Sequence, residues 1–185
     1  MLKRSVILKG IAPLMLDPYA GDNKTQLLPE QKFYFLPNGK RELCIPSANV
    51  HSFLCALNTR SAVKSFYESK VYKNVAAALL GFVSISPFDL PLTRGGKQIV
   101  FTEFGENGIT LDRRVARLPN GIPNPKERPV IALPWEVTFE LTIVPNDVFK
   151  ELDLRNLFEK GGISIGLGTY RGVYGKFVVE KWDEI

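Results

Sequence analysis

The segment from Trp135 to Ile143 has the clearest alternation of hydrophobic and polar residues in the chain. Large apolar residues occupy its odd-numbered positions, and glutamate or threonine occupies its even-numbered ones. Successive side chains of a β-strand point to opposite faces, so this pattern predicts a strand with one buried and one polar face. We expect this strand and the β-rich run 176–182 to lie in one antiparallel sheet. The residues predicted to face the core are Trp135, Val137, Phe139 and Leu141.

Two segments have the spacing of amphipathic helices. Between residues 50 and 57, apolar side chains recur at positions i, i+3, i+4 and i+7, which places them on one helical face. Ser47 precedes this run and is predicted to be the N-cap of the helix. Apolar residues at helical spacing between 71 and 80 predict a second helix.

A third helical segment, 147–160, does not carry a single apolar stripe. We therefore expect a break within it, with Asp153 as a second N-cap, and an end at Gly161. A glycine-rich loop and the run 176–182 follow, and this last run is predicted to be the final strand.

The remaining segments complete a mixed pattern of helices and strands. Residues 5–16 predict the first strand, 32–46 a small hairpin around a Pro-Asn-Gly turn, and 99–104 a further strand-like piece. A turn-rich loop, 17–31, joins the first two. Without these excursions the order of elements is βαββαβ, which is typical of the α+β ferredoxin-like plait. The expected fold is this plait with inserted loops and hairpins and a C-terminal glycine-rich loop.

Composition restricts the class of protein. A chain of 185 residues with 45% hydrophobic and 23% charged residues is expected to form a single globular domain over 1–185. Cys44 and Cys55 lack the spacing of a metal or redox motif, and His51 is the one histidine, so we expect no metal and no other cofactor. Lys9 interrupts the apolar N-terminal run, and no run has the length of a membrane span. We therefore expect a cytoplasmic protein with free thiols and no membrane partner.

The segment from Gly161 to Trp182 has the most unusual composition. Six glycines fall within 161–175, and glycine permits conformations and close contacts that a Cβ forbids. The order helix, loop, strand is not that of a dinucleotide fingerprint, and Gly175-Lys176 is not followed by Ser or Thr as in a P-loop. Two interpretations stay open: a nucleic-acid site, or a tight connection without a ligand. The residues that offer stacking surfaces and positive charge are Tyr170, Arg171, Tyr174 and Lys176.

A second candidate site is the basic segment of about 108–129, which we read as an insertion. The net charge of +5 and a pI near 9.2 permit an anionic partner without requiring one. The segment is either a finger that lies along phosphates or a solvated hairpin with a basic face. Its candidate contact residues are Arg113, Arg114 and Arg117.

Two separated stretches resemble one protein family. Gly166 to Phe177 (GLGTYRGVYGKF) resembles the C-terminal glycine-rich loop of the RAMP superfamily, the repeat-associated mysterious proteins of CRISPR systems. In that family the loop lies between the second helix and the fourth strand of a ferredoxin-like fold. Ile45 to Leu54 (IPSANVHSFL) is similar to the segment Ile-Pro-x-Ser-Ser-Leu-Lys-Gly, which opens the first helix in backbone subunits of CRISPR effector complexes. The resemblance implies RNA contacts at Gly166, Gly168, Tyr170, Arg171, Gly172, Lys176, Asn49 and His51.

The helix motif departs from the family at three positions. His51 stands where the family often has a lysine that touches guide RNA, Ser52 where it has glycine, and Cys55 where an arginine is usual. In type III members an aspartate in the loop after the first strand cuts target RNA. Asp17 and Asp22 occupy this region, although Asp-Pro and Gly-Asp-Asn are also ordinary turn sequences.

Three functions are consistent with the sequence. The first is a non-catalytic RNA-binding subunit, similar to the backbone proteins that grip guide RNA, with other effector subunits or copies of itself as partners. In this function Arg171, Lys176 and the arginines of the basic segment contact phosphates. Tyrosines stack on bases, and the amides of the glycine-rich loop follow the RNA backbone. The second is a metal-independent guide-processing endoribonuclease that uses His51 as general acid or base, with Asp22 as a further catalytic candidate. The third is a mobile-element protein that mimics or inhibits such a subunit.

Overall fold

The computed structural model describes residues 1–22, 24–117, 121 and 123–185, and of residues 116 and 117 only the backbone. Its central sheet contains four antiparallel strands in the order β11-β1-β10-β5. Three helices connect β1 to β5 and one connects β10 to β11, so the order is βαββαβ. The fold is therefore the predicted ferredoxin-like plait. Its strands are β1 (Leu2–Gly10), β5 (Val83–Ser86), β10 (Glu136–Ile143) and β11 (Phe177–Glu184).

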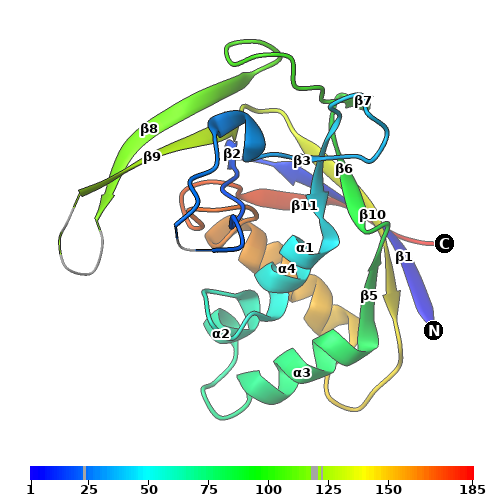
Figure 1. Cartoon of the computed structure of the whole chain (residues 1–185). Helices are drawn as coiled ribbons and strands as arrows, with labels where there is room; N and C mark the ends of the chain where they lie inside the picture. The colour runs from blue at the N-terminus through cyan, green and yellow to red at the C-terminus, as the bar shows by residue number, and fades with distance from the viewer. Residues whose placement is uncertain (23, 118–120, 122) are drawn as a thin grey trace.

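The four α-helices of the described residues lie on the same side of the sheet (Figure 1). Phe158 of the last helix packs between the first helix and β10, with its ring centroid 5.8 Å from Phe53 and 6.1 Å from Phe139. The four residues predicted to face inward from 135–141 are each at most 2% exposed, which confirms the alternation. The helices are α1 (Ser47–Cys55), α2 (Ala62–Phe66), α3 (Tyr72–Phe82) and α4 (Glu151–Ser164).

The inserted segments extend this sheet and add a second one. β4 (Leu43–Pro46) pairs with β3 (Tyr34–Phe35) and with β6 (Asp89–Arg94), which in turn pairs with β10 and with β7 (Lys97–Gln98). The basic segment forms a long hairpin that projects from the body (Figure 1). The hairpin strands β8 (Ile109–Arg117) and β9 (Pro123–Ile131) form a sheet with β2 (Leu14–Met15), and a short 3-10 helix, η1 (Pro29–Gln31), follows the loop after β2.

Three local predictions are wrong. Ser47 is not the N-cap: Pro46 takes that position, and the Ser47 N–H donates to Phe88 O at 2.7 Å. Residues 99–104 form only a single bridge, between Glu42 and Val100, because residues 99–101 bond to neighbouring segments of the chain only briefly before the chain turns at residue 103.

The third error concerns α4. The helix is continuous from residue 151, and Asp153 lies in its first turn, where it accepts a hydrogen bond from the Lys150 N–H at 2.9 Å instead of starting a second helix. Gly161 does not end the helix, which runs on to residue 164. A Cβ at Gly161 would lie 2.7 Å from Cζ of Phe53, so this glycine permits close contact between α4 and α1. The predicted helix is therefore present from residue 151, and the contact with Phe53 explains the glycine within it.

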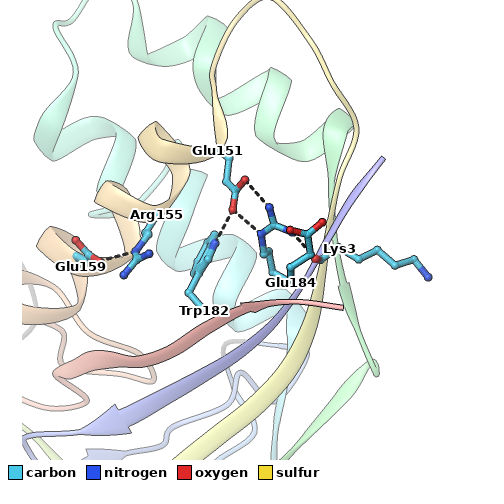
Figure 2. A network of polar contacts seen from close by, with 7 residues as sticks. Lys3, Glu151, Arg155, Glu159, Trp182 and Glu184 are labelled. Atoms are coloured by element: carbon cyan, nitrogen blue, oxygen red, sulfur yellow. Dashed lines mark hydrogen bonds and ion pairs between the residues drawn. The ribbon is translucent and has the colours of Figure 1, made fainter.

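A polar network joins the start of α4 to the two strands β1 and β11. Figure 2 shows Glu151 at its centre, where the carboxylate accepts hydrogen bonds from Arg4 Nε at 2.6 Å, from Arg4 Nη2 at 2.9 Å and from Trp182 Nε1 at 2.8 Å. The hydrogen bond from Arg4 favours the charged carboxylate and lowers the pKa of Glu151 below its ordinary value, against the opposing effect of burial. The network therefore stabilises the fold while Glu151 is ionised.

This network predicts a pH-dependent stability difference. A carboxylate with a lowered pKa contributes stability above its unfolded pKa of about 4.3 and loses it as pH falls through the folded value. Glu151→Gln should therefore be less stable than the native chain at pH 7, and the gap should narrow as pH falls from about 5 toward 3. Urea unfolding at several pH values measures this gap. Glu159→Gln, which breaks the exposed Arg155–Glu159 pair, serves as the control and should show little pH dependence.

No helix in the described part of the chain is both long and apolar enough to cross a lipid bilayer.

Candidate nucleic-acid interface

The two stretches on which the family resemblance depends lie against each other. The Gly168 N–H donates to Asn49 Oδ1 at 2.9 Å, and Arg171 Nη2 donates to Ser52 Oγ at 3.1 Å. The glycine-rich loop, residues 165–176, is thus attached to the exposed side of α1. Residues that are 119 positions apart in sequence form one continuous surface.

The loop is closely packed on the segment that follows β1. Gly168 has φ +74°, and a Cβ there would lie 2.3 Å from the carbonyl oxygen of Met15. The N–H groups of Thr169 and Gly175 donate to Met15 O at 2.9 Å and to Pro13 O at 2.7 Å. Only glycine can adopt this conformation so close to another backbone without strain. Gly166 is buried in the same turn, and Gly172 donates its N–H to Ile165 O at 2.7 Å.

These contacts change the expected role of the loop amides. The N–H groups of Leu167, Gly168, Thr169, Gly172 and Gly175 all donate to acceptors within the protein. An amide that already donates to a protein acceptor cannot also follow an RNA backbone without losing that bond. The N–H groups of these five residues therefore shape the surface and are not free to contact a ligand.

Arg171 points into the protein and holds the loop against α1. Its Nε donates to Gly168 O at 3.3 Å, and its Nη1 donates to Ser52 O at 3.4 Å and to Arg60 O at 3.2 Å. With the bond to Ser52 Oγ, four of the five guanidinium N–H groups are in use, and a bidentate phosphate contact needs two free ones. Burial lowers the pKa of Arg171 from its ordinary value, as expected for a partly desolvated cation.

Other side chains of the loop do face solvent. Tyr170 is 53% exposed, has φ +54°, and lies 5.9 Å from the ring of Tyr174. A positive φ is uncommon for a bulky residue and is often found at binding sites. Lys176 is half-buried and has no hydrogen bond or ion pair from its ammonium to any described residue. Arg60, which the sequence did not indicate, lies beside the loop, with Nη1 3.1 Å from where a Cβ of Gly172 would be.

The hairpin reaches the same surface through Arg114. Its Nη2 donates to the Tyr174 hydroxyl at 3.0 Å, and its guanidinium lies 5.9 Å from the centre of that ring. Acidic neighbours partly neutralise the basic finger, because Arg114 pairs with Asp112 at 2.8 Å and Arg113 with Glu127 at 2.7 Å. The side chain of Arg117 lies outside the described residues.

His51 lies on α1 beside Asn49 and Ser52 and is half-buried. Its Nδ1 is buried and has no hydrogen-bond partner among the described residues. Burial lowers the pKa of the imidazole, so His51 is neutral at pH 7. A general acid or base is usually oriented by a second polar group, and the described residues supply none here.

Asp17 is held between two cations. Its carboxylate pairs with Arg128 Nε at 2.8 Å and with Lys32 Nζ at 3.0 Å, and these bonds join the end of β2 to β9 and to the chain after η1. Burial alone raises the pKa of Asp17, but the hydrogen bonds from Arg128 and Lys32 outweigh it, and the net pKa is lowered. Asp17 is therefore an ionised structural group.

Asp22 forms a local turn. It accepts hydrogen bonds at 2.6 Å from the N–H groups of Lys24 and Thr25 and from the Thr25 hydroxyl, and the last of these contributes most to the lowering of its pKa. This is the ordinary turn chemistry of Asp. A groove of about 710 Å³ lies between this loop and β9, with both aspartates, Arg113 and Lys126 in its wall.

The open face of the plait offers no stacking platform. In β1, β10 and β11, all of them fully described, the side chains directed away from the helices include the pairs Lys9–Glu180 at 3.5 Å and Lys181–Asp183 at 3.1 Å, and none is aromatic. Trp182 is turned inward onto Phe158, with ring centroids 5.6 Å apart. RNA-binding sheets of other folds carry aromatic residues on such a face. The candidate interface is therefore the surface of α1, the glycine-rich loop and Arg114.

The described residues contain no group of three or more His, Cys, Asp or Glu that could hold a metal ion. Cys44 and Cys55 are both free and buried, and burial raises the pKa of Cys55 to about 11. A protonated, buried thiol is a poor nucleophile.

Comparison with known proteins supports the fold. No family model matches the chain, and no curated protein matches it in sequence. One chain of a solved structure, the cryo-EM structure of the Type III-B Cmr-beta bound to cognate target RNA, is similar over 100% of this chain, with a TM-score of 0.63 and 17% identity. This chain spans 60% of the length of that chain. The likeness shows a shared fold.

Proposed function

We propose that this chain is a non-catalytic RNA-binding subunit of a multisubunit CRISPR-type effector complex, with its described residues in a single RAMP-like domain. The observation that supports this most is the combination of the shared fold with the position of the two family-like stretches. The neighbouring structure is a type III-B complex bound to target RNA. In this chain the loop and the first-helix segment that resemble the RAMP family are joined by the Gly168–Asn49 hydrogen bond.

Side chains rather than backbone amides would contact the RNA. Tyr170 offers an exposed ring on which a base can stack, and Tyr174 with Arg114 continues that surface. Lys176 and Arg60 can contact phosphates. Arg171 would act indirectly, because its bonds to Ser52 and Arg60 fix the loop that carries Tyr170.

A non-catalytic role fits the candidate catalytic groups. His51 lacks an orienting partner among the described residues, and the carboxylates of Asp17 and Asp22 already accept hydrogen bonds from their neighbours. The ribonuclease alternative predicts a different result, since it requires RNA cleavage that His51→Ala abolishes. We expect RNA incubated with the native chain to stay intact.

Fluorescence anisotropy with a labelled single-stranded RNA tests the proposal. Tyr170→Ala should weaken binding about tenfold through lost stacking and leave the salt dependence unchanged. Lys176→Ala should weaken binding less, but should reduce the slope of log K against log salt by about 0.7, as expected when one phosphate contact is lost.

The controls replace exposed residues of the same type elsewhere in the fold. Phe88→Ala and Lys73→Ala should bind RNA as the native chain does. The native chain alone is expected to bind weakly and with strong salt dependence, because its net charge is only +5. If both site variants bind as tightly as the two controls, this surface is not the RNA site.

A further inference from the structure

The two edges of the β8–β9 hairpin differ in their backbone groups. Pro129 O accepts a hydrogen bond from the Leu16 N–H, and Glu127 O accepts one from Lys32 Nζ, so odd-numbered residues of β9 direct their backbone away from β8. Three of these odd positions, 123, 125 and 129, are proline. β2 pairs with the base of this edge, and beyond β2 the prolines at 123 and 125 leave few N–H donors, so no further strand can pair there.

The β8 edge is not protected in this way. Leu111 and Val115 pair with Pro129 and Pro125, and Arg113 lies between them. The N–H and C=O groups of all three β8 residues point away from β9. None of these three residues makes a backbone hydrogen bond outside its strand pairing with any described residue, whereas Ile109 at the base bonds with Gly105 and Glu106. Val115 is 61% exposed, and β8 forms the outer side of the projecting hairpin (Figure 1). Native proteins usually block such edges, so an open edge beside a blocked one indicates a strand-pairing surface.

We infer that β8 pairs, edge to edge and antiparallel, with β8 of a second copy of this chain, in a register centred on Arg113. The pairing makes one four-stranded sheet, β9-β8-β8-β9, with two-fold symmetry, in which each copy uses the same surface. The backbone pairing does not depend on the proposed RNA site, although its register uses Arg114, which also contacts Tyr174 in that site.

The charges along β8 select this register. It places Asp112 opposite Arg114 of the second copy and Leu111 opposite Val115, each twice by symmetry. In the single chain Asp112 Oδ1 accepts from Arg114 Nε, while its Oδ2 is buried and has no partner among the described residues. A buried acceptor without a partner calls for an explanation, and an arginine of the second copy supplies a partner when the side chains that cover Oδ2 in the single chain move aside.

Other registers lose these pairs. Moving the centre to Val115 sets Arg113 against Arg117, which is a like-charge pair, and moving it to Leu111 sets Asp112 against Thr110. In the proposed register Arg113 meets its own copy, but each Arg113 is already paired with Glu127 at 2.7 Å. The sequence of β8 thus favours one antiparallel arrangement.

A proline scan of the edge tests the backbone part of the inference. Val115→Pro removes an outward N–H without breaking a hairpin hydrogen bond, because residue 115 faces Pro125 at a non-hydrogen-bonded position. Sedimentation of the full-length chain from about 1 µM to about 1 mM, a range that covers weak interfaces, should show native dimers and monomeric Val115→Pro. Val115→Ala keeps the N–H and should still dimerise. Val115→Pro should bind RNA as the native monomer does, so a failure here leaves the proposed function untouched.

A charge exchange tests the register. Asp112→Arg and Arg114→Asp, each alone, place like charges opposite each other and should sediment as monomers, with circular dichroism to verify folding. An equal mixture of the two variants restores both Asp–Arg pairs and should form a heterodimer. A native chain that stays monomeric throughout the range overturns the inference. Dimers that persist in Val115→Pro, or in both charge variants alone, assign the contact to another surface.

Discussion

Replacing Asp17 with alanine is expected to lower the free energy of unfolding by about 3 kcal/mol, one of the two largest effects we predict for this chain. The side chain is 19% exposed and neutralises Lys32 and Arg128, which are themselves almost buried. Its removal leaves two desolvated cations close together without an anion, and this loss exceeds that of a surface ion pair. Among the described residues, the Lys32 ammonium then retains only its bond to Glu127 O.

Urea unfolding at pH 7 measures the loss, and Asp22→Ala is the matched control. Asp22 lies in the same loop but is exposed, and among the described residues it bonds only within its own turn, so its replacement should change stability little. If Asp17→Ala were as stable as the native chain, the carboxylate would not be the structural anchor that we describe.

Arg171→Lys is expected to lower the free energy of unfolding by roughly 2 kcal/mol, although the positive charge is kept. The ammonium of lysine cannot reach Gly168 O, Ser52 and Arg60 O together, because these acceptors surround a planar guanidinium. Two or three acceptors at the junction of the loop and α1 would lose their donor. The loop should then separate from α1 at lower temperature than the rest of the fold unfolds.

Two measurements separate a structural role from a phosphate contact. In the structural role the melting temperature falls, and RNA affinity measured well below it stays close to native. In the contact role the melting temperature is unchanged and affinity falls. Arg60→Lys is the control for stability, because Arg60 contributes its backbone carbonyl to Arg171 and keeps it in the variant.

The sequence correctly predicted the helices and strands that carry a local pattern of buried and exposed residues. The period-two pattern of 135–143 and the helical spacing of 50–57 both reflect one buried face, so both identify their elements correctly. α2 was missed because five residues are too few to show a period. Gly161 predicts a helix end, because glycine commonly follows a helix. In the structure this glycine instead allows close contact with Phe53, which lies more than a hundred residues earlier.

The candidate site could be predicted only in part, because its local stretches are visible in the sequence and its long-range contacts are not. The loop and the first-helix segment were recognised separately, and the structure brings them together. The direction of the Arg171 side chain depends on Ser52 and Arg60, and the state of Asp17 depends on Arg128, 111 positions away. No local pattern encodes such partners. Arg60 gave no signal at all, because nothing around it in the sequence differs from an ordinary surface turn.

The position of β1 has a consequence for how the chain reaches this fold. β1 precedes both of its neighbours in the chain but lies between them in the sheet, and these neighbours are residues 136–143 and 177–184. During translation its two hydrogen-bonding edges stay open until residues 136–143 and then residues 177–184 have left the ribosome. Pairings between such distant segments carry a large loop-closure entropy and are typical of slow folding. The nascent chain thus exposes the unpaired edges of an apolar strand while more than a hundred further residues are synthesised, and such edges favour aggregation.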